Sequence, residues 1–360
     1  MRRGHFEKLQ PVCPVCRAGG AETGSALKLA HVAREENGHI IEGALHCSNP
    51  NCLREYPIID GIPLLVANIR QYITDNILPI YARRDLSDFT EGMLGDCCGP
   101  NSALDQSRQH LSSYVWDHYG EFDLTRPHQD PVASSAVQSL SEALQLSGAA
   151  PDGPALDFGC SAGRSSFELA ARGQRLVLGV DLHFPMLRLA GEVLRKEIVR
   201  YPRRRTGLVY DWREFPVRFP GSEQVDFWAC DATALPFPSG AFALAVGLNV
   251  LDCVSNPREL LVSLSQALKP AGKVLLTCPY DWSPGATPLE NWLGGHSQRS
   301  QLAGAPDAIL RAILTPGAHS WNVPGLKLIA ERDRLPWNVR LHDRSTMRYE
   351  AHLLIAERSA

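Results

Sequence analysis

From Pro154 onward, short apolar runs alternate with segments in which apolar residues recur at helical spacing. This alternation is typical of a parallel sheet whose strands are joined by crossover helices. The pattern predicts helices at Arg164–Arg172 and about Pro257–Leu268, and a final hairpin around Leu326–Arg332 and Arg348–Glu357. The predicted parallel strands are Ala155–Phe158, Leu176–Val180, Val225–Ala229, Phe242–Gly247 and Lys273–Cys278. The fold class is therefore α/β, with a seven-stranded, mostly parallel sheet, helices on both faces and an antiparallel edge strand from the hairpin.

Two further regions precede this module, and the pattern divides the chain into residues 1–68, 69–150 and 151–360. The first reads as short strands and turns. The second reads as mostly helical, with a break near Gly95–Pro100. Within it, Gln109–Phe122 carries apolar residues at helical spacing, which fits either a lid over a ligand or a helix packed on the sheet.

The first region carries its cysteines in two pairs, Cys13 with Cys16 and Cys47 with Cys52. Two cysteine-bearing turns can complete a tetrahedral set of four thiolates, which is the layout of a zinc ribbon with a structural Zn²⁺. A ribbon without metal, or four unrelated buried thiols, are the alternatives. Met1–Pro11 has no apolar stretch of the secretory kind, so we expect a cytoplasmic, reducing location for these thiols.

Composition narrows the classes of partner. The contents of 44% hydrophobic and 21% charged residues are ordinary for a soluble enzyme. The net charge of −3 provides no overall basic field. Nucleic acid is therefore not favoured as a partner, although it is not excluded. Arg200–Arg205 holds a local arginine cluster, which we interpret as a solvated loop or, alternatively, a phosphate contact. The chain contains no uninterrupted run of about 18 apolar residues, so no membrane span is predicted.

The loop Gly159–Gly163 joins the first predicted strand to a helix. Glycine suits such a sharp turn, where a ligand must contact bare backbone and helix N-terminal amides can meet an anion. A glycine-rich turn alone could also serve a dinucleotide. Asp181 at the end of the second strand could accept hydrogen bonds from both ribose hydroxyls of a nucleoside, and Asp231 after the third strand could contact the adenine amino group.

This series of strands and acids resembles the class I methyltransferases, a Rossmann-like family that uses S-adenosylmethionine. The resemblance implies that Asp157 orients the methionine amino group, and that Gly159 and Gly163 are the loop glycines. Ser161 departs from the family, which often has a middle glycine there. The cofactor-binding residues expected from the resemblance are Asp157, Gly159, Cys160, Gly163, Asp181, Leu182, Asp231, Ala232 and Asn249.

The segment that follows the second cysteine pair carries Tyr56-Pro57-Ile58 and then Asp60-Gly61-Ile62-Pro63. This sequence resembles the Trm112-like zinc ribbons, which activate, stabilise or are fused to methyltransferases. The resemblance covers about 55 residues and implies that residues 1–68 form such a module.

Two loops after predicted strands carry unusual composition. Pro279–Trp282 follows the fifth strand, and Thr287–Gly295 adds a second tryptophan, an acid and an amide. Indoles for stacking, with Glu290 and Asn291 for hydrogen bonds, suit a flat polar ring. The alternative is an inserted segment that packs its tryptophans as core.

These loops, with the glycine loop and the last hairpin, resemble the C-terminal methyltransferase domain of the bifunctional ovothiol synthases over about 200 residues. That domain N-methylates the imidazole of a mercaptohistidine. The present chain departs from the family because it lacks the sulfoxide-synthase domain, so the acceptor could be mercaptohistidine, a selenium analogue or another histidine-like amine. Imidazole is largely neutral near pH 7, so no strong general base is expected.

The resemblance implies a small-molecule substrate and a set of residues for it. The residues expected to hold the ring N–H during catalysis are Tyr280, Asn249 and Glu290. The residues expected to bind the substrate are Asp252, Tyr280, Trp282, Glu290, Asn291, Trp292 and Arg344. Arg340 is an alternative to Arg344 for a substrate carboxylate, His183 is expected to border the adenosine, and His296 and His352 are further candidates.

Two other functions stay open. One is an RNA base methyltransferase. The negative net charge of the chain argues against it, and so does the loop after the fourth strand. That loop reads Asn249-Val250-Leu251-Asp252, where such enzymes commonly have Asn-Pro-Pro-Tyr or Asp-Pro-Pro-Tyr. The other is a non-catalytic adaptor that binds S-adenosylmethionine, against which stand the intact acids and glycines of the module. The sequence does not predict the oligomeric state.

Overall fold

A computed structural model describes residues 1–18, 24–125, 134–173 and 175–359. Its centre is a mixed sheet with the strand order β9-β6-β5-β10-β11-β13-β12. The five parallel members are β5 (Ala155–Phe158), β6 (Val177–Asp181), β9 (Val225–Cys230), β10 (Phe242–Leu248) and β11 (Leu268–Cys278). The final hairpin of β12 (Leu326–His342) and β13 (Ser345–Arg358) adds an antiparallel strand beside β11 and then the edge strand. The predicted α/β class and Rossmann-like sheet are confirmed.

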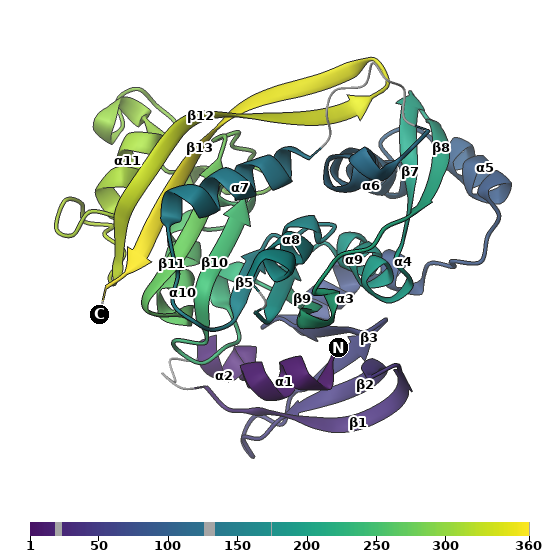
Figure 1. Cartoon of the computed structure of the whole chain (residues 1–360), viewed down its shortest axis with the longest axis horizontal. Helices are drawn as coiled ribbons and strands as arrows, with labels where there is room; N and C mark the ends of the chain where they lie inside the picture. Colours follow the sequence, from purple (N-terminus) through teal and green to yellow (C-terminus); the bar gives the residue numbers. More distant parts are fainter. Residues whose placement is uncertain (19–23, 126–133, 174, 360) are drawn as a thin grey trace.

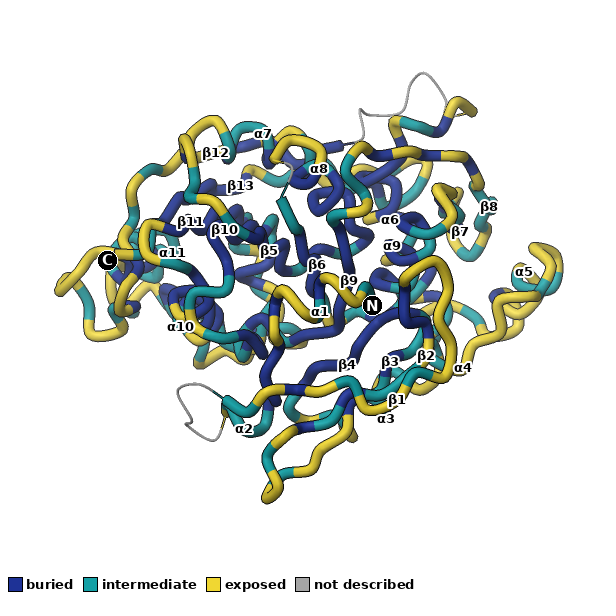
Figure 2. The backbone as a smooth tube through the Cα atoms, turned by 60° about the horizontal axis from the view of Figure 1, so that its bottom comes forward, coloured by how far each residue is buried: buried dark blue, intermediate teal, exposed yellow. Residues whose placement is uncertain are grey.

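The sheet separates two apolar cores. Leu156 and Phe158 of β5 belong to one core and Ala155 belongs to the other, because successive side chains point to opposite faces. The first core is covered by α10 (Pro257–Ala267) and α11 (Pro306–Ile313). The second is covered by α7 (Ser135–Ser147), α8 (Arg164–Gly173) and α9 (Phe184–Lys196). Figure 2 shows the central strands as the buried interior of the molecule.

The N-terminal region extends the same sheet. It contains α1 (Arg3–Leu9), α2 (Pro14–Ala18), β1 (Leu27–Glu36), β2 (His39–Cys47), β3 (Glu55–Ile59) and β4 (Ile62–Leu65). Strand β4 pairs in parallel with β9, with Leu64 opposite Ala229, so the sheet has eleven strands in the order β1-β2-β3-β4-β9 and onward. Figure 1 shows this purple region beneath the central sheet and the yellow hairpin across the top. No pattern in the sequence predicts this continuity.

Side-chain contacts reinforce the junction. Between β9 and β10 the chain forms only the short helix η3 (Ala232–Ala234), and N-terminal residues cover this part of the sheet. The Arg2 backbone N–H donates to Asp226 Oδ2 at 2.7 Å, and the Val12 N–H donates to the Pro236 carbonyl at 2.9 Å. Cys13 and Tyr56 share one apolar core with Trp228 of β9 and Phe237 of the loop that follows it.

The predicted helical region comprises α3 (Ile69–Asp75), α4 (Ile77–Tyr81), α5 (Asp88–Cys98), α6 (Ala103–Tyr119) and η1 (Gly120–Phe122), followed by α7. Helix α6 begins after Ser102, whose hydroxyl accepts the Asp105 N–H at 3.2 Å, as an N-cap should. One side of α6 buries Val115, Trp116 and Tyr119 in the second core. The remaining short helices are η2 (Ser222–Gln224), η4 (Leu251–Cys253), η5 (Leu289–Asn291) and η6 (Gln301–Gly304).

The arginine cluster does not form a loop, and that interpretation was wrong. It lies on β7 (Ile198–Thr206), which pairs with β8 (Val209–Pro216) as a separate two-stranded hairpin. Carboxylates pair with its guanidinium groups: Arg200 contacts Asp88 at 2.7 Å and Arg203 contacts Asp343 at 2.9 Å. Among the described residues, no helix is both long and apolar enough to cross a membrane.

Candidate functional site

A cavity of about 700 Å³ opens at the carboxyl ends of β5, β6, β9 and β10. This is where open α/β sheets bind ligands, and the volume suits a small molecule or cofactor. Strand ends contribute Gly159–Ser161, Asp181–His183, Cys230–Ala232 and Leu248–Val250 to its wall. His110, Tyr114 and His118 of α6 also line it. Helix α6 is therefore both packed on the core and part of the cavity wall.

The glycine loop is shaped for close backbone approach. Gly159 has φ +66°, and a Cβ on it would lie 2.4 Å from a methyl carbon of Val250. Gly163 has φ +87°, and a Cβ there would lie 2.5 Å from the Phe227 ring. Both positions therefore exclude side chains on two independent grounds, conformation and space. Ser161 takes φ +50° between them, and its N–H donates to Asp181 Oδ2 at 2.8 Å.

The predicted acids differ in their positions. Asp181 and Asp231 line the cavity, and Asp181 also accepts the His183 N–H at 2.8 Å. Asp157 is buried behind the wall, where its carboxylate accepts the Ser165 hydroxyl at 2.7 Å and the Ser166 hydroxyl at 2.5 Å. Burial raises the pKa of Asp157 to about 6. Of the other expected cofactor residues, Gly159, Cys160, Leu182, Ala232 and Asn249 line the cavity, while Gly163 supports the loop from behind.

Two buried polar atoms of lining residues have no hydrogen-bond partner within the described part of the chain, namely Ser161 Oγ and His183 Nδ1. Buried polar atoms are nearly always bonded, so such atoms beside a cavity indicate that a ligand or water completes them. Burial lowers the pKa of His183, which favours the neutral form of its ring. The cavity therefore combines a volume large enough for a nucleoside with two carboxylates, exposed backbone of the glycine loop and two polar atoms that can bond a ligand.

Most residues expected to bind the substrate lie outside this cavity wall. Asp252 lines it, as does Asn249, which is expected to hold the ring N–H, but Tyr280, Trp282, Glu290, Asn291, Trp292 and Arg344 do not. Trp282 and Trp292 stack on each other with ring centroids 6.1 Å apart, and the Trp292 N–H donates to the Thr287 carbonyl at 2.8 Å. Glu290 is exposed. Trp282 and Trp292 are both half-buried, and they contact each other rather than the cavity.

The remaining expected side chains either have partners elsewhere or are exposed. The Asn291 amide donates to the Ser255 carbonyl at 2.9 Å. Arg344 is exposed in the final hairpin, and Arg340 is buried against Asp343. His352 is buried and bonded to Tyr280 and Glu331, while His296 is exposed.

Several lining residues were not predicted as part of a site. Tyr114 and His110 lie on the predicted helix, but helical spacing does not reveal which side chains meet a ligand. Trp337 and Tyr349 reach the cavity from β12 and β13, and Asp281 reaches it from the loop after β11. Their convergence depends on pairing between strands that are distant in sequence.

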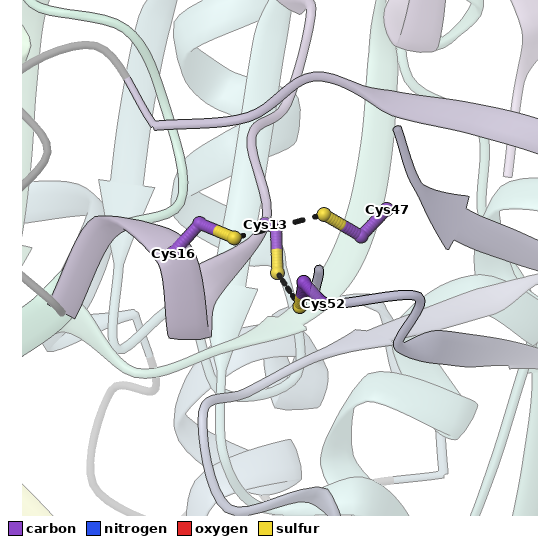
Figure 3. A group of neighbouring side chains, drawn as sticks. All are labelled: Cys13, Cys16, Cys47 and Cys52. Atoms are coloured by element: carbon purple, nitrogen blue, oxygen red, sulfur yellow. Dashed lines mark hydrogen bonds between the residues drawn. The ribbon is translucent and has the colours of Figure 1, made fainter. Parts of the chain in front are cut away.

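The four N-terminal cysteines converge as predicted. Their Sγ atoms all lie within 4.8 Å of one another, with Cys13 to Cys52 at 3.8 Å and Cys16 to Cys47 at 3.7 Å. Figure 3 shows the four side chains directed at a common point. Four sulfurs at about 2.3 Å from one zinc ion would form a tetrahedron with edges of about 3.8 Å. The donor set and spacing therefore fit Zn²⁺.

Neighbouring donors suit a cluster of thiolates. The Asn49 N–H points to Cys47 Sγ at 3.4 Å, and the Asn49 side-chain amide points to Cys16 Sγ at 3.6 Å. The Tyr56 hydroxyl lies 3.1 Å from Cys13 Sγ. Such contacts orient ligands around a metal.

Residues 156–276, about a third of the chain, match the family model described as "Methyltransferase domain". A search of curated proteins finds no match. Among solved structures, a similar one is Haemonchus contortus phosphoethanolamine N-methyltransferase 2 in complex with S-adenosyl-L-methionine, at 22% identity over 46% of this chain and 32% of that one, with a TM-score of 0.33. The present chain thus spans about a third of that protein's length.

Two further structures are similar. One is a Methanosarcina mazei SAM-dependent methyltransferase, at 21% identity over 58% of this chain and 93% of that one, with a TM-score of 0.37. The other is a chain of the complex between the Haloferax volcanii Trm112 methyltransferase activator and a methyltransferase, at 13% identity over 63% of this chain and 89% of that one, with a TM-score of 0.38. Residues 156–276 thus match a methyltransferase domain and lie within a Rossmann-like α/β sheet.

Proposed function

We propose that this protein transfers a methyl group from S-adenosylmethionine to a ring nitrogen of a small, histidine-derived acceptor, such as mercaptohistidine or its selenium analogue. The observation that carries the methyltransferase part is the convergence of the Gly159–Gly163 loop, Asp181 and Asp231 around one cavity within the matched domain. The histidine-derived acceptor rests on the resemblance of the strand-end loops.

The residues present fit the cofactor. Asp181 would hold the ribose hydroxyls, and Asp231 would contact the adenine amino group. Ser161 Oγ and His183 Nδ1 would gain the partners that they lack among the described residues. When bound, S-adenosylmethionine supplies a methyl group on a sulfonium, which is a good leaving group.

The protein's part in the reaction is to align the acceptor and exclude water. Asn249 lines the cavity, and the Thr277 hydroxyl donates to its Oδ1 at 2.8 Å, so its amide N–H groups are the part of the side chain that can bond a ligand. A donor there can hold an atom with a lone pair, but it cannot accept a ring N–H. We therefore assign that acceptor role to Asp252 or Asp281, which line the cavity, rather than to Glu290 or Tyr280.

The first experiment measures binding and transfer separately. Calorimetry with S-adenosylhomocysteine tests the cofactor site, and labelled S-adenosylmethionine with mercaptohistidine, histidine or bulk RNA tests the acceptor. We expect binding of S-adenosylhomocysteine, weakened at least about tenfold in Asp181→Ala because two charge-assisted hydrogen bonds are lost. Exposed Glu197 provides the control variant Glu197→Ala, for which affinity should not change.

Each other outcome has a distinct meaning. Transfer only to RNA would refute the small-molecule acceptor, and absence of cofactor binding would favour the adaptor. Full affinity in Asp181→Ala would show that the ribose lies elsewhere.

We also propose that the Cys13, Cys16, Cys47 and Cys52 cluster holds one structural Zn²⁺ in a Trm112-like ribbon. Support comes from the donor set and the tetrahedral spacing of the sulfurs. The ribbon then stabilises the methyltransferase module through the β4–β9 pairing rather than by contact with the acceptor, because no ribbon residue lines the cavity among those described.

A further inference from the structure

The cavity is acidic throughout. Its charged lining residues are four aspartates, and no lysine or arginine lines it among the described residues. Two of these acids, Asp181 and Asp231, belong to the proposed cofactor site. The other two, Asp252 and Asp281, lie beyond it, on the loops after β10 and β11.

Asp252 and Asp281 form a connected pair. The Asp281 backbone N–H donates to Asp252 Oδ2 at 2.7 Å, and the Tyr349 hydroxyl donates to Asp281 Oδ2 at 2.8 Å. Asp252 is 2% exposed, and its Oδ1 accepts a weak hydrogen bond from the Cys253 thiol at 3.7 Å. Each carboxylate thus has one well-bonded oxygen and one oxygen without a strong donor among the described residues.

A buried carboxylate without a cation nearby is costly. Burial raises the pKa of Asp252, which is the expected response to this cost. A positively charged ligand would remove this cost by pairing with one of these acids, which leaves the other to accept a ring N–H. A negatively charged ligand, such as a phosphate or RNA, would instead be repelled by the four carboxylates.

Aromatic side chains complete the same part of the cavity. Tyr114 from α6, Trp337 from β12 and Tyr349 from β13 all line it. Faces of tyrosine and tryptophan rings attract organic cations, and this adds to pairing with the buried Asp252 and the exposed Asp281.

We propose that the subsite of Asp252, Asp281 and Tyr349 binds a cationic group, an ammonium or another positively charged nitrogen, on the methyl acceptor. This inference rests on the proposed function, because it assigns the rest of the cavity to the cofactor. The cationic group is distinct from the atom that takes the methyl, since a protonated nitrogen has no lone pair. The acceptor is therefore a small molecule with at least two polar groups, one cationic and one nucleophilic.

The test uses the full chain saturated with S-adenosylhomocysteine, so that cofactor binding is measured before any probe is added. Calorimetry then compares two cations with neutral molecules of matched shape: histamine with 4-imidazoleethanol, and choline with 3,3-dimethylbutanol. We expect at least one cation to bind about tenfold or more tightly than its neutral partner, as a charge-assisted contact should. Imidazolepropionate, an anion, should bind more weakly than either imidazole probe.

Variants locate the effect. In Asp281→Asn and Asp252→Asn, the preference for the cation should fall at least about fivefold, while the affinity for S-adenosylhomocysteine stays within twofold. Glu350→Gln removes the same charge one residue from Tyr349, on an exposed side chain, and should keep the full preference.

The inference would be overturned if the cations bound no more tightly than their neutral partners, or if neither cation bound the loaded protein. It would also be overturned if imidazolepropionate bound more tightly than the imidazole probes, or if both aspartate variants kept the full preference for the cation. Failure of the chain to bind S-adenosylhomocysteine would instead refute the proposed function.

Discussion

The Tyr280 hydroxyl lies 2.7 Å from Nδ1 of the buried His352. Tyr280 has φ +59°, a left-handed conformation that is unfavourable for a residue with a side chain. His352 in turn contacts Glu331, which pairs with Arg311. This chain of contacts fixes Tyr280 outside the cavity, and the turn that it makes directs the next residue, Asp281, to Asp252.

Tyr280→Phe should therefore weaken the acceptor site without touching the cofactor. The change keeps the ring but leaves His352 without a partner for Nδ1, which should lower the free energy of unfolding by about 1 kcal/mol. We expect an increased KM for the acceptor, an affinity for S-adenosylhomocysteine within twofold of wild type, and a small loss in the denaturant midpoint. A large fall in kcat at unchanged KM would instead assign Tyr280 to the reaction itself.

Gly159→Ala should cost more than its backbone conformation alone. The new Cβ would lie 2.4 Å from Val250, whereas a Cβ at Gly207, which has φ +53°, meets nothing within 4 Å. Gly207→Ala is thus a matched control that should lose about 1 kcal/mol through conformation only. Gly159→Ala should lose about 2–4 kcal/mol and most cofactor affinity, because overpacking is added. Urea unfolding with calorimetry measures both, and equal losses would contradict the described fit.

The ionisation of Asp157 should destabilise the free protein. Because burial raises its folded-state pKa to about 6, the folded state holds its proton more tightly than the unfolded state does. The resulting penalty is absent below about pH 4 and is complete above about pH 7, so this contribution to stability falls as the pH rises between them. Relative to Asp157→Asn, the wild type should lose on the order of 2–3 kcal/mol across that range.

Urea midpoints of both proteins from pH 4 to pH 8 provide the measurement. Parallel profiles would show that Asp157 titrates at its ordinary value. Asp157→Asn should also bind S-adenosylhomocysteine more weakly at pH 8.

Purified protein should contain about one zinc per chain by metal analysis. Cys47→Ser should lose the metal and lower the melting temperature of the whole protein, because the ribbon and the main sheet share the β4–β9 pairing. Cys98→Ser alters an exposed thiol outside the cluster and serves as the control. Separate melting of the ribbon, with an unchanged main transition, would show that the two parts unfold independently.

Individual elements explain what the sequence could predict. Strand β5 was predicted to the residue, and β6, β9 and β10 within one residue at each end, because continuous apolar runs end there at glycine or aspartate. Strand β11 begins five residues before the predicted start, at Leu268, because Lys269–Gly272 reads as a turn. The hairpin β7–β8 was missed because arginines alternate with few apolar residues in its first strand.

The site divides in the same way. Residues of the Gly159–Gly163 loop, Asp181 and Asp231 follow directly from strand ends, so local sequence identifies them. The tryptophans of Thr287–Gly295 have a composition that suits either a ligand or a core, and only packing decides between them. Asp281, Trp337 and Tyr349 enter the cavity through turns and strand pairing that no local pattern encodes.

The pairing of β4 with β9 also has a consequence for synthesis on the ribosome. Leu65 and Val225 are separated by 160 positions in the chain, so at 5–20 residues per second β4 waits roughly 8–32 s for its partner. During that interval the nascent ribbon presents an unpaired backbone edge, the kind that recruits other chains. Production of this protein should therefore respond to translation speed and to chaperones that shield strand edges, even when the finished molecule is stable.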